Sequence, residues 1–99
     1  MLSESYPILL VEDSEDDQAL IRRAFAKAKL SNPLHIVDDG DKAVAYLRGE
    51  GQYADREAHP LPTIILLDLK LPRRSGHEVL QWLRSQPSLP RIPVVVLTS

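Results

Sequence analysis

The sequence contains no cysteine and no long apolar run, and its net charge is only −2. Without cysteine there are no disulfides, no thiolate metal ligands and no thiol nucleophile. Every apolar run is far shorter than the roughly 20 residues that span a bilayer, and the first residues lack the pattern of a signal peptide. The small net charge gives no general reason to bind nucleic acid or an anionic membrane. We therefore expect a soluble, cytoplasmic protein with neither of these partners.

The length and composition indicate one ordered domain. The 99 residues suffice for a single core but are few for a complete five-stranded α/β layer structure. Apolar residues make up 43% of the chain and charged residues 26%, which is ordinary for a globular protein and argues against disorder.

The most informative stretch is residues 63–72, with the sequence TIILLDLKLP. The apolar residues 63–67 predict a short strand that is buried within a parallel sheet. Asp68 follows at its carboxyl end, which is the side where open α/β sheets bind ligands. For an isolated Asp, capping of the strand or of the next turn is the simpler explanation.

Two further strands also run into polar residues. The apolar residues 8–11 lead to Glu12 and Asp13, and the apolar residues 92–97 lead to Thr98. If the three strands are parallel, their carboxyl ends meet at one edge of the sheet, so these side chains lie close together. Capping does not readily explain such a convergence.

Strands alternate with helices along the chain, which predicts a doubly wound parallel sheet with right-handed crossovers. The strand at residues 34–37 is the most polar and is expected at an edge. Residues 51–62 show no periodicity and predict a surface loop. Strands are expected at residues 8–11, 34–37, 63–67 and 92–97, and helices at residues 14–29, between the turn at 38–41 and Gly49, and around residues 79–85.

Carboxylates gathered at the strand ends would repel one another by on the order of 3 kcal/mol per pair, at about 5 Å and an effective dielectric constant near 20. A hard divalent cation offsets this repulsion, and Mg²⁺ suits a site made of oxygen ligands. Zn²⁺ is disfavoured because no His or Cys is expected nearby. An Asp beside a metal and a Thr hydroxyl suits phosphoryl transfer, with the carboxylate as nucleophile.

With these features, the sequence resembles a known family, the receiver domain of two-component response regulators. Residues 45–53 and 67–73 look most like the small single-domain regulators that serve bacterial phytochrome kinases. The resemblance spans the whole chain. Its motifs are the acidic pair Glu12 and Asp13, the strand-end Asp68, Pro72 and Gly76 at the usual offsets from that Asp, and Thr98.

The resemblance implies that Asp68 is a phosphoacceptor, which takes its phosphoryl group from a sensor histidine kinase, with phytochrome-type kinases as the candidates. It implies that Asp13, Asp68 and the backbone carbonyl of Lys70 bind Mg²⁺, while Glu12 acts mainly through water in the outer shell. Thr98 would be the switch hydroxyl. The protein would then be a signalling phosphoacceptor rather than an enzyme.

The chain departs from the family pattern at its end. Receivers continue past the fourth strand, whereas this sequence stops at Ser99. We therefore expect residues 1–99 to form a flavodoxin-like receiver fold, incomplete at the C-terminus, with strand order 2-1-3-4 and without the fifth strand and last two helices. The apolar final strand would become an edge, which predicts self-association through it.

Three alternatives differ in class. The chain could be a non-phosphorylatable receiver fragment that acts only as a folding or protein-interaction module. A haloacid-dehalogenase-like phosphatase would need a second Asp two residues after Asp68, where this chain has Lys70. A dinucleotide-binding domain would need a Gly-rich turn after the first strand, where acids stand instead and would repel pyrophosphate.

Overall fold

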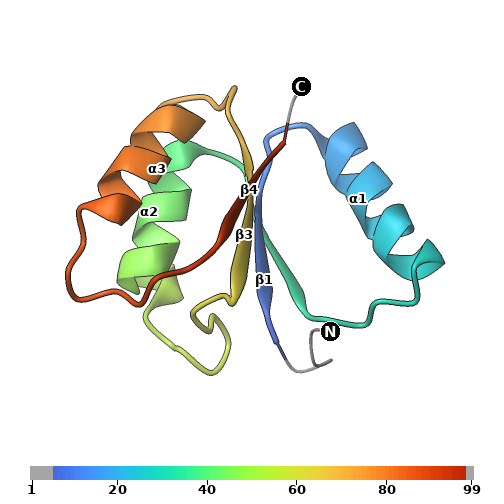
Figure 1. Ribbon diagram of the computed structural model, residues 1–99, viewed down its shortest axis with the longest axis horizontal. Helices are drawn as coiled ribbons and strands as arrows, with labels where there is room; N and C mark the ends of the chain where they lie inside the picture. Colours follow the sequence, from blue (N-terminus) through green and yellow to red (C-terminus); the bar gives the residue numbers. More distant parts are fainter. Residues whose placement is uncertain (1–5, 98–99) are drawn as a thin grey trace.

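The computed structural model, which describes residues 6–97, is a parallel sheet with helices on both faces (Figure 1). The predicted strand order is confirmed as β2-β1-β3-β4. Helix α1 covers one face, and α2 and α3 cover the other. The strands are β1 (Ile8–Val11), β2 (Leu34–Val37), β3 (Ile64–Asp68) and β4 (Val94–Leu97), and the helices are α1 (Glu15–Lys27), α2 (Gly40–Arg48), α3 (Gly76–Arg84) and the 3₁₀ turn η1 (Gly51–Tyr53).

The element boundaries differ from the expected ones where local chemistry decides them. Strand β4 begins at Val94 rather than residue 92, next to Pro93, which has no N–H to donate to a sheet. Helix α2 begins at Gly40, before its apolar stripe, because the Asp39 carboxylate accepts a 2.7 Å hydrogen bond from the Lys42 N–H. None of the described helices is long and apolar enough to cross a membrane.

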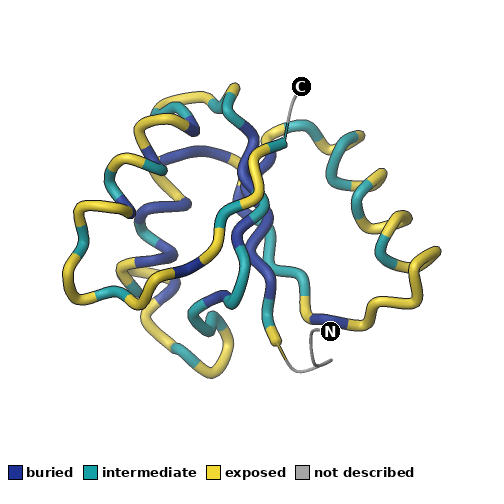
Figure 2. The backbone as a smooth tube through the Cα atoms, in the orientation of Figure 1, coloured by how far each residue is buried: buried dark blue, intermediate teal, exposed yellow. Residues whose placement is uncertain are grey.

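The core lies between the sheet and the α2–α3 layer. Tyr46 and Leu47 of α2 pack there against Leu9 and Leu67 of the sheet, and all four are at most 2% exposed. The opposite face is much more open, because α1 has no buried residue (Figure 2). The Leu20 side chain on α1 is 55% exposed. The face under α1 is nevertheless packed at β1, where Ile8 and Leu10 are at most 3% exposed.

The prediction of a featureless surface loop at residues 51–62 is wrong in part. Tyr53 in η1 is buried, and its ring lies 5.2 Å from the ring of Tyr46. The guanidinium of Arg56 donates to the carbonyls of Tyr46 and Leu47, both at 2.8 Å, and to that of His59 at 3.1 Å. Arg56 thus supplies donors to two carbonyls in the last turn of α2, where the helix itself offers few. This contact holds the long connection against the core.

Candidate functional site

The register of the sheet brings the predicted acidic residues together. Val11 and Leu67 are partners across β1 and β3, so Glu12 and Asp68 follow at the same level. One carboxylate oxygen from each of Glu12, Asp13 and Asp68 lies within 4.8 Å of the others. Glu12 is 3% exposed and Asp68 is 2% exposed, whereas Asp13 is exposed. The expected convergence of these three carboxylates is therefore observed.

Glu12 is fixed by backbone and side-chain hydrogen bonds. Its N–H donates to the Val37 carbonyl at 3.0 Å, which continues the β1–β2 pairing by one residue. Its carbonyl accepts from Gln18 Nε2 at 2.7 Å, and its Oε2 accepts from the Ser14 N–H at 3.1 Å. The Ser14 side chain also caps α1 by accepting a hydrogen bond from the Asp17 N–H. The first turn of α1 thus orients one acid of the site.

The backbone that follows Asp68 is held close to α3. The Lys70 N–H donates to Asp68 Oδ1 at 3.0 Å, and the Gly76 N–H donates to the Leu69 carbonyl at 3.1 Å. A Cβ at Gly76 would lie only 2.3 Å from the Asp68 carbonyl oxygen. Glycine is therefore needed here so that α3 can begin beside the site.

The loop between β3 and α3 is also attached to the start of α2. A Cβ at Gly40 would lie 1.8 Å from the Arg74 carbonyl oxygen, so only glycine allows this approach. Arg74 Nε lies 3.1 Å from Asp41 Oδ1, and Arg73 Nε lies 3.9 Å from Asp39 Oδ2. The need for glycine at position 40 was not predicted from the sequence. One feature of the sequence could have indicated it. Glycine is a poor helix former, so its presence in the first turn of a helix suggests that a side chain does not fit there.

The electrostatics of the site oppose full ionisation. Burial is the main reason why the pKa of Glu12 is raised above its usual 4.5. The Ser14 N–H lowers this pKa in part, whereas the charge of Asp68, a hydrogen bond with its carboxyl group and the charge of Asp17 raise it. Two carboxylates at 4.8 Å repel by about 3 kcal/mol at an effective dielectric constant of about 20.

The donor set fits a hard divalent cation. Three carboxylates meet at the edge of the sheet, and among residues 6–97 this group offers oxygen ligands alone. Mg²⁺ and Mn²⁺ prefer such ligands, whereas Zn²⁺ is usually bound by His or Cys. Thr98, the predicted switch hydroxyl, lies outside the described residues.

The histidines have other positions. His35 and His59 lie beside the ring of Tyr46, with centroid distances of 6.1 and 5.8 Å. Burial, with a smaller contribution from His59, lowers the pKa of His35. Burial also raises the pKa of Tyr46 to about 12, and its hydroxyl donates to the Pro60 carbonyl at 2.9 Å. Trp82 is partly buried and packs against the core.

Replacing Glu12 by Gln should stabilise the metal-free protein near neutral pH. The raised pKa means that the folded state binds more protons than the unfolded state between pH 4.5 and the folded-state pKa. The contribution of Glu12 to stability therefore falls as the pH rises through this window. We expect Glu12→Gln to raise the Tm, measured by thermal unfolding in EDTA. Each kcal/mol of electrostatic repulsion that the substitution removes should raise the Tm by about 4–8 °C.

Glu15→Gln is the matched control, because Glu15 is exposed and its charge in the first turn of α1 is favourable. This variant should leave the Tm unchanged or lower it slightly. A lower Tm for Glu12→Gln than for the original protein would contradict the assignment of repulsion to this carboxylate.

Comparison with known proteins agrees with this geometry. Residues 8–99 match the response regulator receiver domain family. The chain is 45% identical over 102 residues to the response regulator Rcp1 of Synechocystis sp. (strain ATCC 27184 / PCC 6803 / Kazusa), covering all of this chain and 67% of that protein.

Two solved structures are close in both fold and sequence. One is the phosphorylated cyanobacterial phytochrome response regulator RcpA, with a TM-score of 0.85 and 47% identity, covering 95% of this chain and 65% of that one. The other is the Mn²⁺-bound form of Rcp1, with a TM-score of 0.83 and 45% identity, covering 94% and 65%. This chain spans about two thirds of the length of these relatives. The chain belongs to the response regulator receiver domain family.

Proposed function

We propose that this receiver domain accepts a phosphoryl group on Asp68 from a sensor histidine kinase. The main support is that the buried Asp68 carboxylate lies close to those of Glu12 and Asp13 at the end of a central strand. The similarity to RcpA, whose structure is that of a phosphorylated protein, supports this proposal. In this role the chain is a signalling phosphoacceptor and not an enzyme that turns over an external substrate.

The transfer needs few protein groups. A carboxylate oxygen of Asp68 attacks the phosphorus of the kinase phosphohistidine, and an O–P bond forms as the N–P bond breaks. The imidazole leaves with the electron pair of that bond and takes up a proton, and the product is an aspartyl phosphate. The Lys70 N–H holds Asp68 Oδ1 at 3.0 Å and so orients the nucleophile.

The proposed metal ligands are Asp13, Asp68 and the backbone carbonyl of Lys70, with Glu12 acting mainly through a bound water. Mg²⁺ at this position would neutralise the charge that develops on the transferred phosphoryl group. The Mn²⁺-bound form of the relative Rcp1 supports a divalent cation in this family. Mg²⁺ and Mn²⁺ both prefer oxygen ligands, and we propose Mg²⁺ as the ion that this site binds.

Thr98 is the proposed switch hydroxyl. It follows Leu97, the last residue of β4, and Leu97 is the register partner of Asp68. We propose that this hydroxyl donates a hydrogen bond to a phosphoryl oxygen on Asp68 after transfer.

The proposed partner is a histidine kinase of phytochrome type. The similarity to RcpA, described as a phytochrome response regulator, supports this choice. An exposed Lys70 stands next to the site, and Arg73 is 72% exposed, so basic side chains are available at this edge for contact with the kinase.

Phosphorylation by acetyl phosphate in the presence of Mg²⁺ tests this function. We expect the mass of the protein to increase by one phosphoryl group, and Asp68→Asn to abolish the increase, because an amide is not a nucleophile for this reaction. Asp16→Asn is the matched control and should behave as the original chain, because Asp16 is exposed in the first turn of α1. Intact-mass spectrometry measures the product.

Phosphate on the Asp68→Asn variant would place the acceptor elsewhere. No phosphate on the original chain, with or without Mg²⁺, would favour the second candidate function, a non-phosphorylatable receiver that serves only as an interaction module. The exposed apolar residues of β4 are the observation that favours this second candidate.

We also propose that two copies of this chain associate through β4. This strand is at the edge of the sheet, and it carries no charged residue. Val95 is 49% exposed and Val96 is 42% exposed. Exposed edge strands normally carry Lys, Pro or a bulge, which discourage pairing with another chain. The unpaired backbone groups of β4 are therefore suited to pairing with a second copy.

Sedimentation velocity over a range of concentrations tests this association. We expect the original chain to self-associate and Val95→Lys to remain monomeric, because a charge on the edge strand opposes pairing. Leu30→Lys is the matched control: Leu30 is 43% exposed, but it lies before β2, at the opposite edge of the sheet. This control should associate as the original chain does. A monomeric original chain at the highest concentration would rule out the proposal.

A further inference from the structure

The side chain of Gln18 connects α1 to the end of β1. Its Nε2 donates to the Glu12 carbonyl at 2.7 Å, which is at the short end of the usual range for an N–H···O hydrogen bond. Glu12 lies between the end of β1 at Val11 and the start of α1 at Glu15, so this carbonyl belongs to neither element. Gln18 therefore supplies a donor to a backbone group at the acidic site.

The direction of this hydrogen bond shows that it does not cap the helix. The free backbone groups at a helix N-terminus are N–H donors, and a capping side chain accepts from them. The Ser14 side chain already does this by accepting from the Asp17 N–H at 3.3 Å. Gln18 instead donates, and it reaches past the cap to Glu12. No residue of α1 is buried, so Gln18 does not belong to the core either.

Asp13 lies in a turn that Gln18 holds from two sides. The Gln18 N–H donates to the Ser14 carbonyl at 2.9 Å, and the Gln18 side chain donates to the Glu12 carbonyl. Glu12 and Ser14 are the neighbours of Asp13 in the chain. The Glu12 carbonyl is part of the peptide unit that joins Glu12 to Asp13, and such a unit is planar. Holding this unit therefore restricts the direction in which the Asp13 side chain leaves the backbone.

Asp13 is the member of the acidic group that most needs to be held in this way. Glu12 and Asp68 are 3% and 2% exposed, so burial restricts them, whereas Asp13 is exposed. An exposed side chain loses conformational freedom when it binds a cation, and a backbone that is already held lowers this cost. Removing a group that orients a metal ligand typically costs about 10–100-fold in affinity for the metal.

We propose that Gln18 is a positioning residue for cation binding, which holds Asp13 in the direction that the shared site requires through its hydrogen bond to the Glu12 carbonyl. This inference rests on the proposed function, in which Asp13 and Asp68 bind Mg²⁺. Gln18 supplies no ligand itself and acts on the orientation of Asp13. The contacts that support the inference all lie within residues 12–18.

Calorimetric titration of Gln18→Met with Mg²⁺ tests this inference. Met has nearly the length of Gln and is also a good helix former, but its side chain cannot donate a hydrogen bond. We expect the affinity for Mg²⁺ to fall by roughly tenfold. Gln18→Asn keeps the amide but is shorter by a methylene group, so it should weaken binding similarly.

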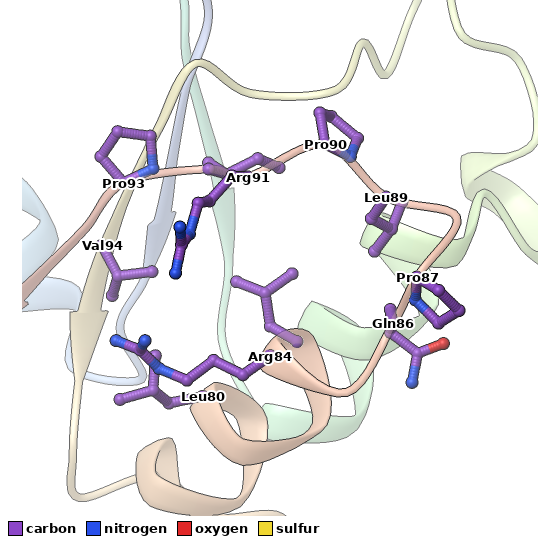
Figure 3. A pocket seen from close by; sticks show the side chains of 11 residues that line it. Leu80, Arg84, Gln86, Pro87, Leu89, Pro90, Arg91, Pro93 and Val94 are labelled. Carbon is purple, nitrogen blue, oxygen red and sulfur yellow. The ribbon is translucent and has the colours of Figure 1, made fainter.

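Gln86→Met is the matched control. Gln86 lies in the connection between α3 and β4 (Figure 3), and its Nε2 also donates to a backbone carbonyl, that of Trp82, at 3.2 Å. The start of α3 at Gly76 lies beside the acidic site, whereas Gln86 follows the other end of this helix. The variant thus removes the same kind of hydrogen bond away from the site. It should leave the affinity for Mg²⁺ unchanged.

Two further measurements separate positioning from a purely structural role. Thermal unfolding in EDTA and in excess Mg²⁺ gives the increase in Tm that the cation causes, and this increase should be smaller for Gln18→Met than for the original chain. A purely structural role would lower both Tm values equally. In phosphorylation by acetyl phosphate, Gln18→Met should need roughly tenfold more Mg²⁺ for the half-maximal rate. At saturating Mg²⁺ it should reach the rate of the original chain, because Asp68 is unchanged.

Circular dichroism of each variant verifies that the fold is retained. Equal affinities of the original chain and Gln18→Met for Mg²⁺ would overturn the inference and leave the proposed phosphoacceptor function intact. The same loss of affinity in Gln18→Met and Gln86→Met would also overturn it. Absence of Mg²⁺ binding by the original chain would overturn both the inference and the metal site on which it rests.

Discussion

The mutual repulsion of three carboxylates is the constraint on which the rest of the site depends. Oxygen atoms of Glu12, Asp13 and Asp68 lie within 4.8 Å of one another, and two of these residues are almost fully buried. A fold optimised for stability alone would not place acids there, because burial without compensation disfavours the charged form. A bound divalent cation would offset this repulsion, which is why we propose that the three carboxylates form a cation site.

The surrounding structure holds this unfavourable arrangement in place through backbone contacts. The β1–β3 register sets Glu12 beside Asp68, and the cap of α1 orients the Glu12 carboxylate. Gly76 and Gly40 allow α3 and the start of α2 to approach the loop that follows β3. Because these are close contacts between backbone segments, a movement of this loop would require α2 and α3 to shift as well. The packed α2–α3 layer therefore supports the site mechanically as well as stabilising the core.

The opposite side of the sheet is organised differently. No residue of α1 is buried, and Val95 on β4 is about half exposed. Val94 packs against the α2–α3 core, so Val95, the next residue in the strand, faces the α1 side. Among residues 6–97, the α2–α3 side therefore contains most of the core and supports the site, whereas the α1 side is more exposed.

Much of this architecture could be predicted from the sequence, for identifiable physical reasons. The alternation of apolar strands and amphipathic helices predicted a parallel sheet. The acids that follow residues 8–11, together with Asp68, predicted that their carboxylates lie close together at one edge of that sheet. The packing of the long connection was missed, because the contact of Arg56 with the end of α2 depends on tertiary structure rather than on periodicity. The requirement for glycine at position 40 was missed for the same reason. It arises only because the Arg74 backbone lies where a side chain would be.

Calorimetric titration with Mg²⁺ shows whether the three carboxylates form one cation site. We expect weak binding of one Mg²⁺ to the original chain and an affinity lower by roughly tenfold in Asp13→Asn, which removes one charged ligand. Asp17→Asn, which removes a carboxylate from the first turn of α1 instead, should change the affinity much less. Equal affinities of the original chain and Asp13→Asn would mean that Asp13 is not a ligand of a shared cation.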